Sequence, residues 1–231
     1  MGLEIFYDLP APSDWHRDRV LAANEVAHQT ALGLGFAEVD SIVPNLPDCP
    51  QTLSVQDAPD GLYGLRAKAE DGWIFRTWPG EGCETALFGL CRFPGTVMAG
   101  DRLIPTGWGE GWHHHTWCKT QYADRISRGH FLKCHRGVIA ILDAFRSAGI
   151  EVNVRDGSGF WDHRDQAELV RQLDEWNGTV AAVAGAFKDA LGESAGRVVS
   201  PIFSAPDFEH LEAQGHETFR RKRDESCRDG P

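Results

Sequence analysis

Three strand-like segments follow one another in the middle of the chain with only short turns between them. They are LYGLRAKA at 62–69, GWIFRTW at 72–78 and CETALFGLCRF at 83–93. The turns EDG and PGEG are short, which favours antiparallel pairing of the strands on either side of them. This region therefore predicts an antiparallel sheet.

Extended and helical segments alternate on both sides of this region. Further strands are expected at 3–9, 36–43, 111–122, 150–154 and 197–203, and helices after Ser13 or Asp14, at 131–148 and at about 164–191. The last helix has the clearest pattern, because its apolar residues recur at steps of three and four. The order predicts an α+β fold, a mixed and largely antiparallel sheet with three main helices packed on it.

Two similar hexapeptides raise the question of an internal repeat. SDWHRD at 13–18 and FWDHRD at 160–165 each follow a predicted strand and open a predicted helix. A duplicated strand–helix unit would explain the similarity, and so would shared helix-capping chemistry. With 42% apolar residues, the chain can bury one core over residues 1–214, with sub-halves 1–110 and 111–214 as the alternative. The charged segment 215–231 is expected to be a flexible tail.

Charge and cysteine usage restrict the partners and the compartment. The formal net charge of −11 repels phosphate backbones and anionic lipids, so we expect a small-molecule ligand rather than nucleic acid or a membrane. The opening MGLEIFYDLPAPSDW lacks the basic region and apolar run of a signal peptide. The six cysteines contain no C-x-x-C pair, which predicts reduced thiols in the cytoplasm. The oligomeric state stays open.

The stretch GWHHHTWCKTQYADR at 111–125 is the best candidate for a site. If 111–122 is a strand, its side chains alternate between two faces. One face carries His113, His115, Trp117, Lys119 and Gln121, and the other Trp112, His114, Thr116, Cys118, Thr120 and Tyr122. Cys118 and Tyr122 are expected to point into the core.

His113 and His115 are two residues apart, a spacing that lets two imidazoles on one strand reach a single ion. A zinc or manganese ion would need a third ligand from another element. The candidates are Asp156, which we favour, and Glu110, His163 and Asp165. The alternative is an ordinary strand or a polar site without metal.

The segment VRDGSGFWDHRD at 154–165 runs from a strand through glycines into a helix. Backbone amides at Gly157, Gly159 and the helix start could hold an anion, and a divalent cation would offset repulsion from the aspartates. The alternative is that Asp162 caps the helix and Asp165 favours its first turn. Asp8, at the end of the first strand, could face the same crevice.

The thiols offer a weaker hypothesis. On a helix, Cys134 lies on the apolar face, which predicts a small buried thiol, and its neighbour His135 does not face it. A nucleophilic Cys118 would need His135 or His163 as its base, and the sequence does not place them together.

These features favour an enzyme, hydrolase-like, acting on a small polar or anionic substrate in an aromatic-walled pocket. The expected catalytic residues are His113, His115, Asp156 and Lys119, and the expected ligand-binding residues are Trp112, Trp117, Tyr122, Trp161, Gly157 and Gly159. The sequence also allows a non-catalytic protein that binds a small ligand, or an acidic inhibitor-like or immunity-like interaction protein. Whether the chain is an enzyme at all stays open.

Overall fold

The computed structural model describes residues 3–44, 51–53, 65–106, 111–191, 201–205 and 207–228. Its contacts divide the chain into two compact units. One unit is Glu4–Arg155, and the other is Asp156–Pro231 together with the first three residues. The fold class is α+β, as predicted. The division lies between Arg155 and Asp156, whereas the sequence suggested a sub-half boundary after residue 110.

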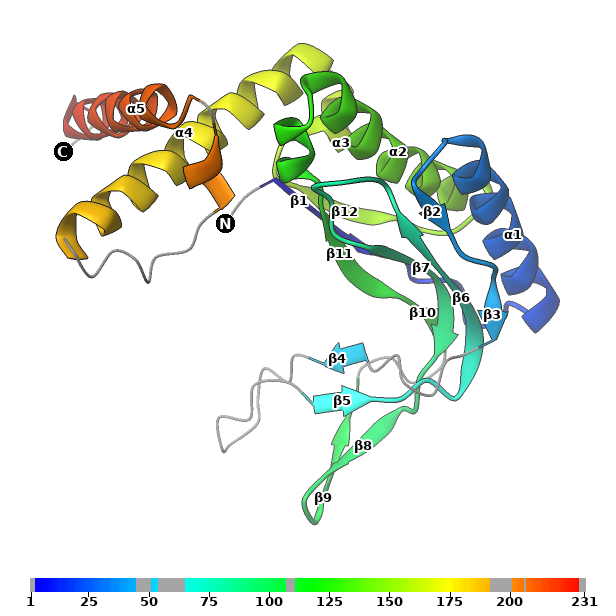
Figure 1. Cartoon of the computed structure of the whole chain (residues 1–231). Coiled ribbons are helices and arrows are strands. Elements are labelled where there is room, and N and C mark those ends of the chain that lie inside the picture. The colour runs from blue at the N-terminus through cyan, green and yellow to red at the C-terminus, as the bar shows by residue number, and fades with distance from the viewer. Residues whose placement is uncertain are drawn as a thin grey trace. The chain divides into compact units, whose positions relative to one another are not determined.

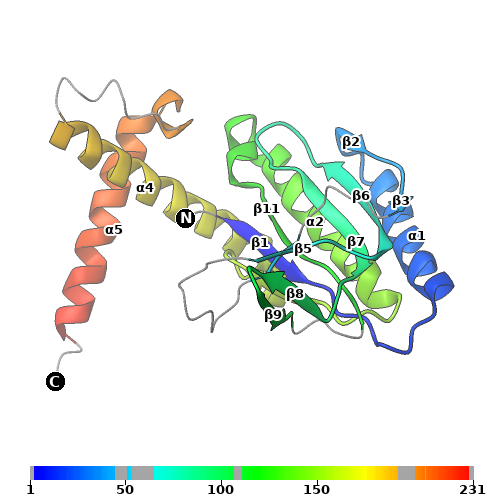
Figure 2. The same ribbon diagram turned by 90° about the horizontal axis from the view of Figure 1, so that it is seen from below.

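The first unit contains a sheet with the order β11-β1-β12 and a sheet with the order β10-β7-β6-β2, in which β3 also pairs with β6. The strands are β1 (Glu4–Asp8), β2 (Glu38–Val39), β3 (Val43–Pro44), β6 (Asp71–Trp78), β7 (Ala86–Arg92), β10 (Trp112–His113), β11 (His115–Lys119) and β12 (Asn153–Asp156). The predicted antiparallel pairing of 72–78 with 83–93 is confirmed by β6 and β7. Figure 2 shows β1, β11, β7 and β6 side by side.

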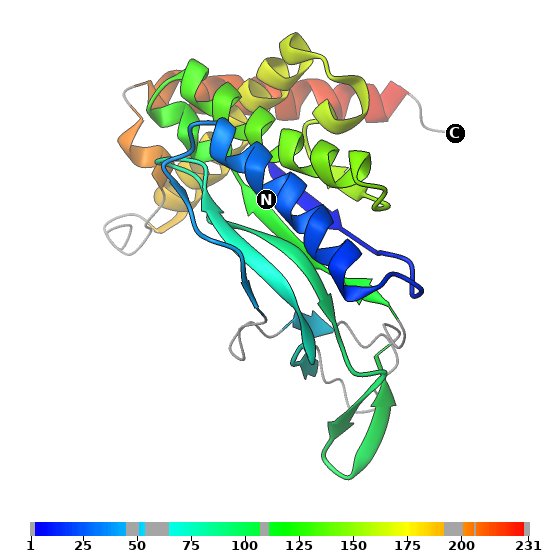
Figure 3. The ribbon, with the colours of Figure 1, turned by 90° about the vertical axis from the view of Figure 1, so that its right-hand side faces the viewer.

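Helices α1 (Arg17–Gly33) and α2 (Arg128–Ser147) cover one face of these strands (Figures 1 and 3). The core beneath them is aromatic. The ring of Phe88 on β7 lies 5.2 Å from that of Tyr7 on β1 and 5.6 Å from that of Phe75 on β6. It also stacks on Phe145 of α2, at 6.4 Å. This cluster joins both sheets and α2 in a single core.

The histidine stretch forms a strand that is interrupted once. β10 ends at His113 and β11 begins at His115, so β10 pairs with β7 while β11 pairs with β1. The predicted strand continued to residue 122, but Gln121–Arg125 forms a 3-10 helix, η1. The predicted loop 94–109 contains a hairpin of β8 (Thr96–Ala99) and β9 (Arg102–Pro105), for which Gly100 supplies a positive φ of 61°. A second hairpin pairs β4 (Gln51–Leu53) with β5 (Leu65–Ala67).

The described part of the second unit is mainly helical after the turn at Gly157 and Ser158. It contains α3 (Phe160–His163), α4 (Gln166–Leu191), the 3-10 helix η3 (Pro201–Ser204) and α5 (Phe208–Arg228). The predicted strand 197–203 is not formed where the structure describes it, and 197–200 lie outside the described residues. The segment expected to be a tail is helical as far as Arg228. None of the described helices is long and apolar enough to cross a membrane.

Close packing explains why the charged C-terminal segment is helical. Gly178 of α4 and Gly215 of α5 lie where the two helices cross, and a Cβ on Gly215 would come within 2.0 Å of the Gly178 carbonyl oxygen. Phe208 and Leu211, in the first turns of α5, pack on a buried cluster that includes Ala181. These contacts with α4 stabilise α5, although its charged composition alone does not predict a stable helix.

Candidate functional site

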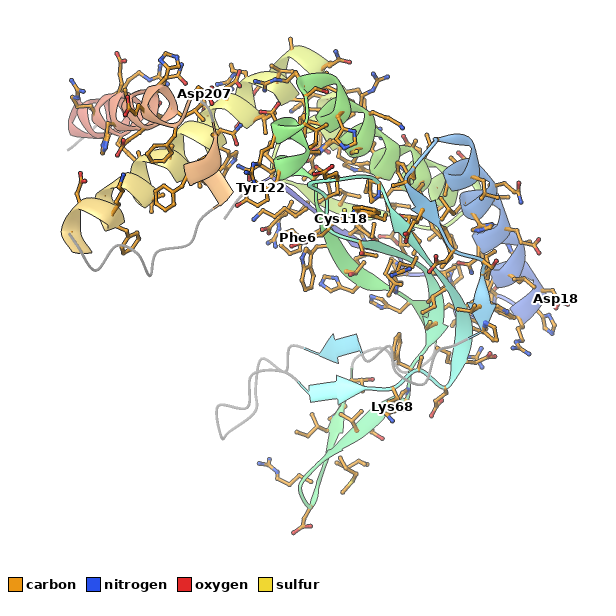
Figure 4. The ribbon with its side chains drawn as sticks, viewed as in Figure 1. Phe6, Asp18, Lys68, Cys118, Tyr122 and Asp207 are labelled. Atoms are coloured by element: carbon orange, nitrogen blue, oxygen red, sulfur yellow. The ribbon has the colours of Figure 1, made fainter. Side chains whose placement is uncertain are left out.

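Strands β1 and β11 present a row of polar and aromatic side chains on one face. Their register places Lys119 opposite Glu4, Trp117 opposite Phe6, and His115 opposite Asp8. Because residues directly opposite each other share a face, these six side chains lie on the same side of the sheet. The alternate residues, among them Ile5, Tyr7 and Cys118, are buried on the other face. Figure 4 shows Phe6 on the side of the sheet away from the helices.

Asp8 lies between two imidazoles. Nε2 of His113 hydrogen bonds to Oδ1 of Asp8, and Nδ1 of His115 lies 4.0 Å from the same oxygen. The side chains are 18% exposed for His113, 31% for Asp8 and 51% for His115. The predicted sharing of a face by His113 and His115 agrees with this arrangement, and Asp8 is the carboxylate that joins them.

Opposing effects act on the pKa of Asp8. Partial burial alone would raise it. The hydrogen bond and charge of His113, the charge of His115 and a hydrogen bond from the Asn153 amide outweigh burial, so the pKa lies below its usual value. Asp8 is therefore a carboxylate at neutral pH, and its negative charge lies beside both imidazoles.

The middle of the row is aromatic. The rings of Phe6 and Trp117 lie 6.3 Å apart, and Trp117 is 51% exposed. The guanidinium of Arg155, on β12, lies 4.4 Å from the centre of the Phe6 ring, a cation–π distance. This part of the face combines a flat apolar surface with a positive charge.

The far end of the row is occupied by Lys119. Its Nζ lies 3.5 Å from Oε1 of Glu4 and 5.2 Å from the centre of the Tyr122 ring. Tyr122, expected in the core, is half-buried on η1. Lys119 therefore shares the face with His113 and His115 but pairs with a different carboxylate.

Trp112 does not belong to this face, although it was expected to bind ligand. It is buried on the helix side, where its Nε1 donates to the Trp15 carbonyl oxygen at 3.0 Å and its ring stacks on Trp73. His114 is buried on the same side and donates from Nε2 to the Leu87 carbonyl oxygen at 2.8 Å. Strand alternation separates both from the two flanking histidines.

The predicted residues after β12 form a turn in the second unit. The Asp156 carboxylate accepts hydrogen bonds from Ser158 N at 2.9 Å, Ser158 Oγ at 2.7 Å and Trp161 N at 3.0 Å. Gly157 lies in this turn, and Gly159 adopts a positive φ of 70° at the start of α3. Trp161 is buried. These contacts show Asp156 ordering a turn and the start of a helix.

Asp165 also has a capping role. Its Oδ1 accepts from Ala167 N at 2.8 Å and from Glu168 N at 3.2 Å, at the beginning of α4. The capping alternative therefore holds for this segment, with Asp165 rather than Asp162 making these cap contacts.

The predicted zinc or manganese site is not assembled in the part of the chain that the structure describes. Among those residues, no three His, Cys, Asp or Glu side chains are placed to hold a metal ion. The carboxylate beside His113 and His115 is Asp8, and the oxygens of the favoured third ligand, Asp156, accept backbone and hydroxyl hydrogen bonds. Glu110 lies outside the described residues.

The predicted thiol–histidine pairs are also rearranged. Nδ1 of His135 lies 2.9 Å from Oγ1 of Thr120, and both side chains are buried. Cys134 faces His130 instead, one helical turn earlier, with 3.7 Å between Sγ and Nε2. His130 had not been singled out, although its spacing of four from Cys134 was the available signal.

Comparisons with known proteins give no assignment. No family model matches the chain, and searches of curated proteins and of solved structures also find no match. The function must therefore be argued from the chemistry of the described residues.

Proposed function

We propose that this chain is a hydrolase-like enzyme acting on a small polar or anionic substrate at the face formed by β1 and β11. The observation that carries the proposal is the position of Asp8 between His113 and His115. A carboxylate beside an imidazole orients the ring and stabilises its protonated form, as acid–base catalysis requires.

The exposures suggest separate roles for the two histidines. His115 is about half exposed, so a substrate can reach it, and we assign it the proton transfer. His113 is largely buried and hydrogen bonds to Asp8, so we assign it the positioning of that carboxylate. Asp8 would then stabilise the positive charge that His115 gains when it takes a proton from the attacking group.

The rest of the row suggests what the substrate looks like. Trp117 and Phe6 can pack against a flat or apolar portion, and Arg155 beside them can attract an anionic group. Lys119 supplies a second cation on the same face. The predicted set of catalytic residues is thereby revised, with Asp8 in place of Asp156 and Lys119 in a binding role.

Chromogenic p-nitrophenyl esters, phosphates and phosphodiesters test this proposal. Hydrolysis by the wild-type protein should fall by roughly 10²-fold or more in His115→Gln and in Asp8→Asn, because acid–base groups typically contribute 10²–10⁴-fold. His216→Gln is the matched control, since its side chain is 52% exposed and lies on α5. Equal activity in all four proteins would assign the hydrolysis to another site or to a contaminant.

The aromatic part of the row also supports a second function, binding without catalysis. A half-exposed Trp117 beside Phe6 and Arg155 can hold a ligand whether or not His115 transfers protons. A ligand found by thermal shift would then bind more weakly to Trp117→Ala and equally well to His115→Gln, and it would be recovered chemically unchanged from the wild-type protein.

We also propose that the protein is cytoplasmic. The free thiols of Cys83, Cys91, Cys118 and Cys134 are consistent with that location.

An interaction protein, the third possibility, is favoured by a different observation. Met98 and Leu103 lie opposite each other on β8 and β9, and both side chains are exposed. The convergence of His113 and His115 on Asp8 has no role in an interaction protein. We therefore rank this function below the enzyme and the ligand-binding protein.

A further inference from the structure

Three cysteines lie close together where the turn between β6 and β7 meets α2. Cys83 lies in that turn, Cys118 on β11 and Cys134 on α2. Cys83 N donates to the Gly80 carbonyl oxygen at 3.0 Å, and Sγ of Cys118 lies 3.4 Å from the carbonyl oxygen of the next residue, Glu84. The thiols of Cys83 and Cys134 interact with each other, and both interact with Cys118. All three are free thiols. The turn between β6 and β7 therefore brings Cys83 next to Cys134, although the two residues are distant in sequence.

The turn is shaped to hold this contact. Gly80 has a φ of 156°, and a Cβ there would lie 2.6 Å from Cε1 of His130 and 3.4 Å from Sγ of Cys134. The Cys134 thiol lies 3.5 Å from the Pro79 carbonyl oxygen, and Nε2 of His130 lies 3.0 Å from the Glu81 carbonyl oxygen. Any side chain larger than that of glycine at position 80 would therefore push the turn away from α2.

The environment activates one thiol of the pair. The hydrogen bond from Cys83 lowers the pKa of Cys134; burial opposes this, and the charges of His130 and Lys133 assist it, so that the pKa is about 7. The same hydrogen bond, together with burial, raises the pKa of Cys83. At neutral pH a substantial fraction of Cys134 is therefore thiolate, whereas Cys83 keeps its proton.

We propose that Cys83 and Cys134 are a redox-active dithiol that closes to a disulfide when the protein meets a peroxide. The proposal stands on the packing against Cys134 of the turn that carries Cys83, on His130 beside Cys134, and on the partial exposure of Cys83 next to a buried Cys134. It is independent of the proposed hydrolase site, which lies on the opposite face of the sheet.

The first step oxidises the activated sulfur. The Cys134 thiolate attacks one oxygen of the peroxide, the O–O bond breaks, and Cys134 becomes a sulfenic acid. The departing hydroxide takes the proton of Cys83 to form water, which leaves Cys83 as a thiolate.

The second step closes the disulfide. The Cys83 thiolate attacks the Cys134 sulfur, the S–S bond forms and the S–O bond breaks, and the hydroxide that leaves is protonated by the buffer. The two cysteines lose two electrons in total, and one hydrogen peroxide becomes two waters. Because Cys83 lies next to Cys134, it traps the sulfenic acid before further oxidation.

The test is a disulfide map of the full-length protein in a Cys91→Ser background. Trypsin leaves Cys83 and Cys91 together in the peptide 77–92 and Cys134 in the peptide 134–136, so removing Cys91 makes the assignment unique. Hydrogen peroxide is added, remaining thiols are alkylated, and the unreduced protein is digested. We expect peptide 77–92 linked to peptide 134–136, with a mass loss of about two hydrogens that dithiothreitol reverses.

A second variant traps the intermediate. In Cys83→Ser, Cys134 should retain its sulfenic acid and be labelled by dimedone when the protein is unfolded in its presence, whereas the Cys91→Ser protein should show little label. Cys118→Ser is the neighbouring control and should still form the link. The proposal is overturned if Cys83 links to Cys118, if both thiols survive peroxide, or if Cys134 goes directly to sulfinic acid in the Cys91→Ser protein.

Discussion

The carboxylate of Asp8 hydrogen bonds to Nε2 of His113, although 105 positions separate the two residues. Asp8 is the last residue of β1, and His113 is the last residue of β10, just before the break in the histidine stretch. His115 then begins β11 directly opposite Asp8. The break at His114 thus leaves one imidazole on each side of a single carboxylate.

Replacing Asp8 with asparagine should lower the free energy of unfolding by about 1–2 kcal/mol at pH 7, because a partly buried charge-assisted hydrogen bond is lost. The pKa of Asp8 is lowered from 3.8 in the folded protein, so this stabilisation is present above pH 3.8 and disappears as the pH falls through the lower folded-state value. Urea unfolding of both proteins at pH 7 and pH 3 measures the difference. Glu38→Gln, at the exposed Arg76 pair, should cost less than about 1 kcal/mol.

His114 should make stability depend on pH in a different range. Burial is the largest effect and lowers the pKa of His114 from 6.5 to about 4, so the unfolded chain binds a proton that the folded chain does not between these values. The free energy of unfolding should therefore decrease by about 3 kcal/mol as the pH falls from 6.5 to 4. Urea unfolding across this range should show the decrease in wild type and in His115→Gln, but much less of it in His114→Gln. An unchanged slope in His114→Gln would assign the effect to other groups.

Trp112 on β10 and Trp117 on β11 should respond differently to truncation. Trp112 is buried and hydrogen-bonded, so Trp112→Ala should cost about 3–5 kcal/mol of stability. Trp117 is half exposed, so Trp117→Ala should cost about 1 kcal/mol while weakening the binding of any ligand that packs on the face. Chemical denaturation measures the first effect, and ligand-induced thermal shifts measure the second. Equal stability losses would contradict the assignment of the two faces.

Gly89 should not tolerate a side chain. It has a φ of 148° opposite Ile74, and a Cβ there would lie 2.2 Å from the Trp73 carbonyl oxygen and 2.7 Å from the Ile74 Cα. Gly89→Ala should therefore lose about 3 kcal/mol, since backbone atoms must move. Gly33→Ala, at the end of α1, has nothing within 4 Å of its Cβ and should change stability by less than about 1 kcal/mol. Thermal unfolding of the two variants compares them directly.

Local periodicity determined much of the architecture from the sequence alone. Short turns predicted the antiparallel pairing of β6 and β7, and the apolar steps after residue 164 predicted α4. Alternation likewise placed His113 and His115 on one face and Cys118 in the core. These features depend on residues close together in the chain, whose geometry repeats every two or 3.6 residues.

Tertiary structure alone decided which distant residues meet. Asp8 rather than Asp156 joins the two histidines because β11 pairs with β1 in a particular register, and register cannot be read from either strand by itself. Cys83 meets Cys134 for a similar reason, since only the packing of the β6–β7 turn on α2 brings them together. The predicted tail became α5 because its apolar first turns and Gly215 fit against α4. Composition and spacing describe one segment at a time, whereas each of these contacts belongs to two segments.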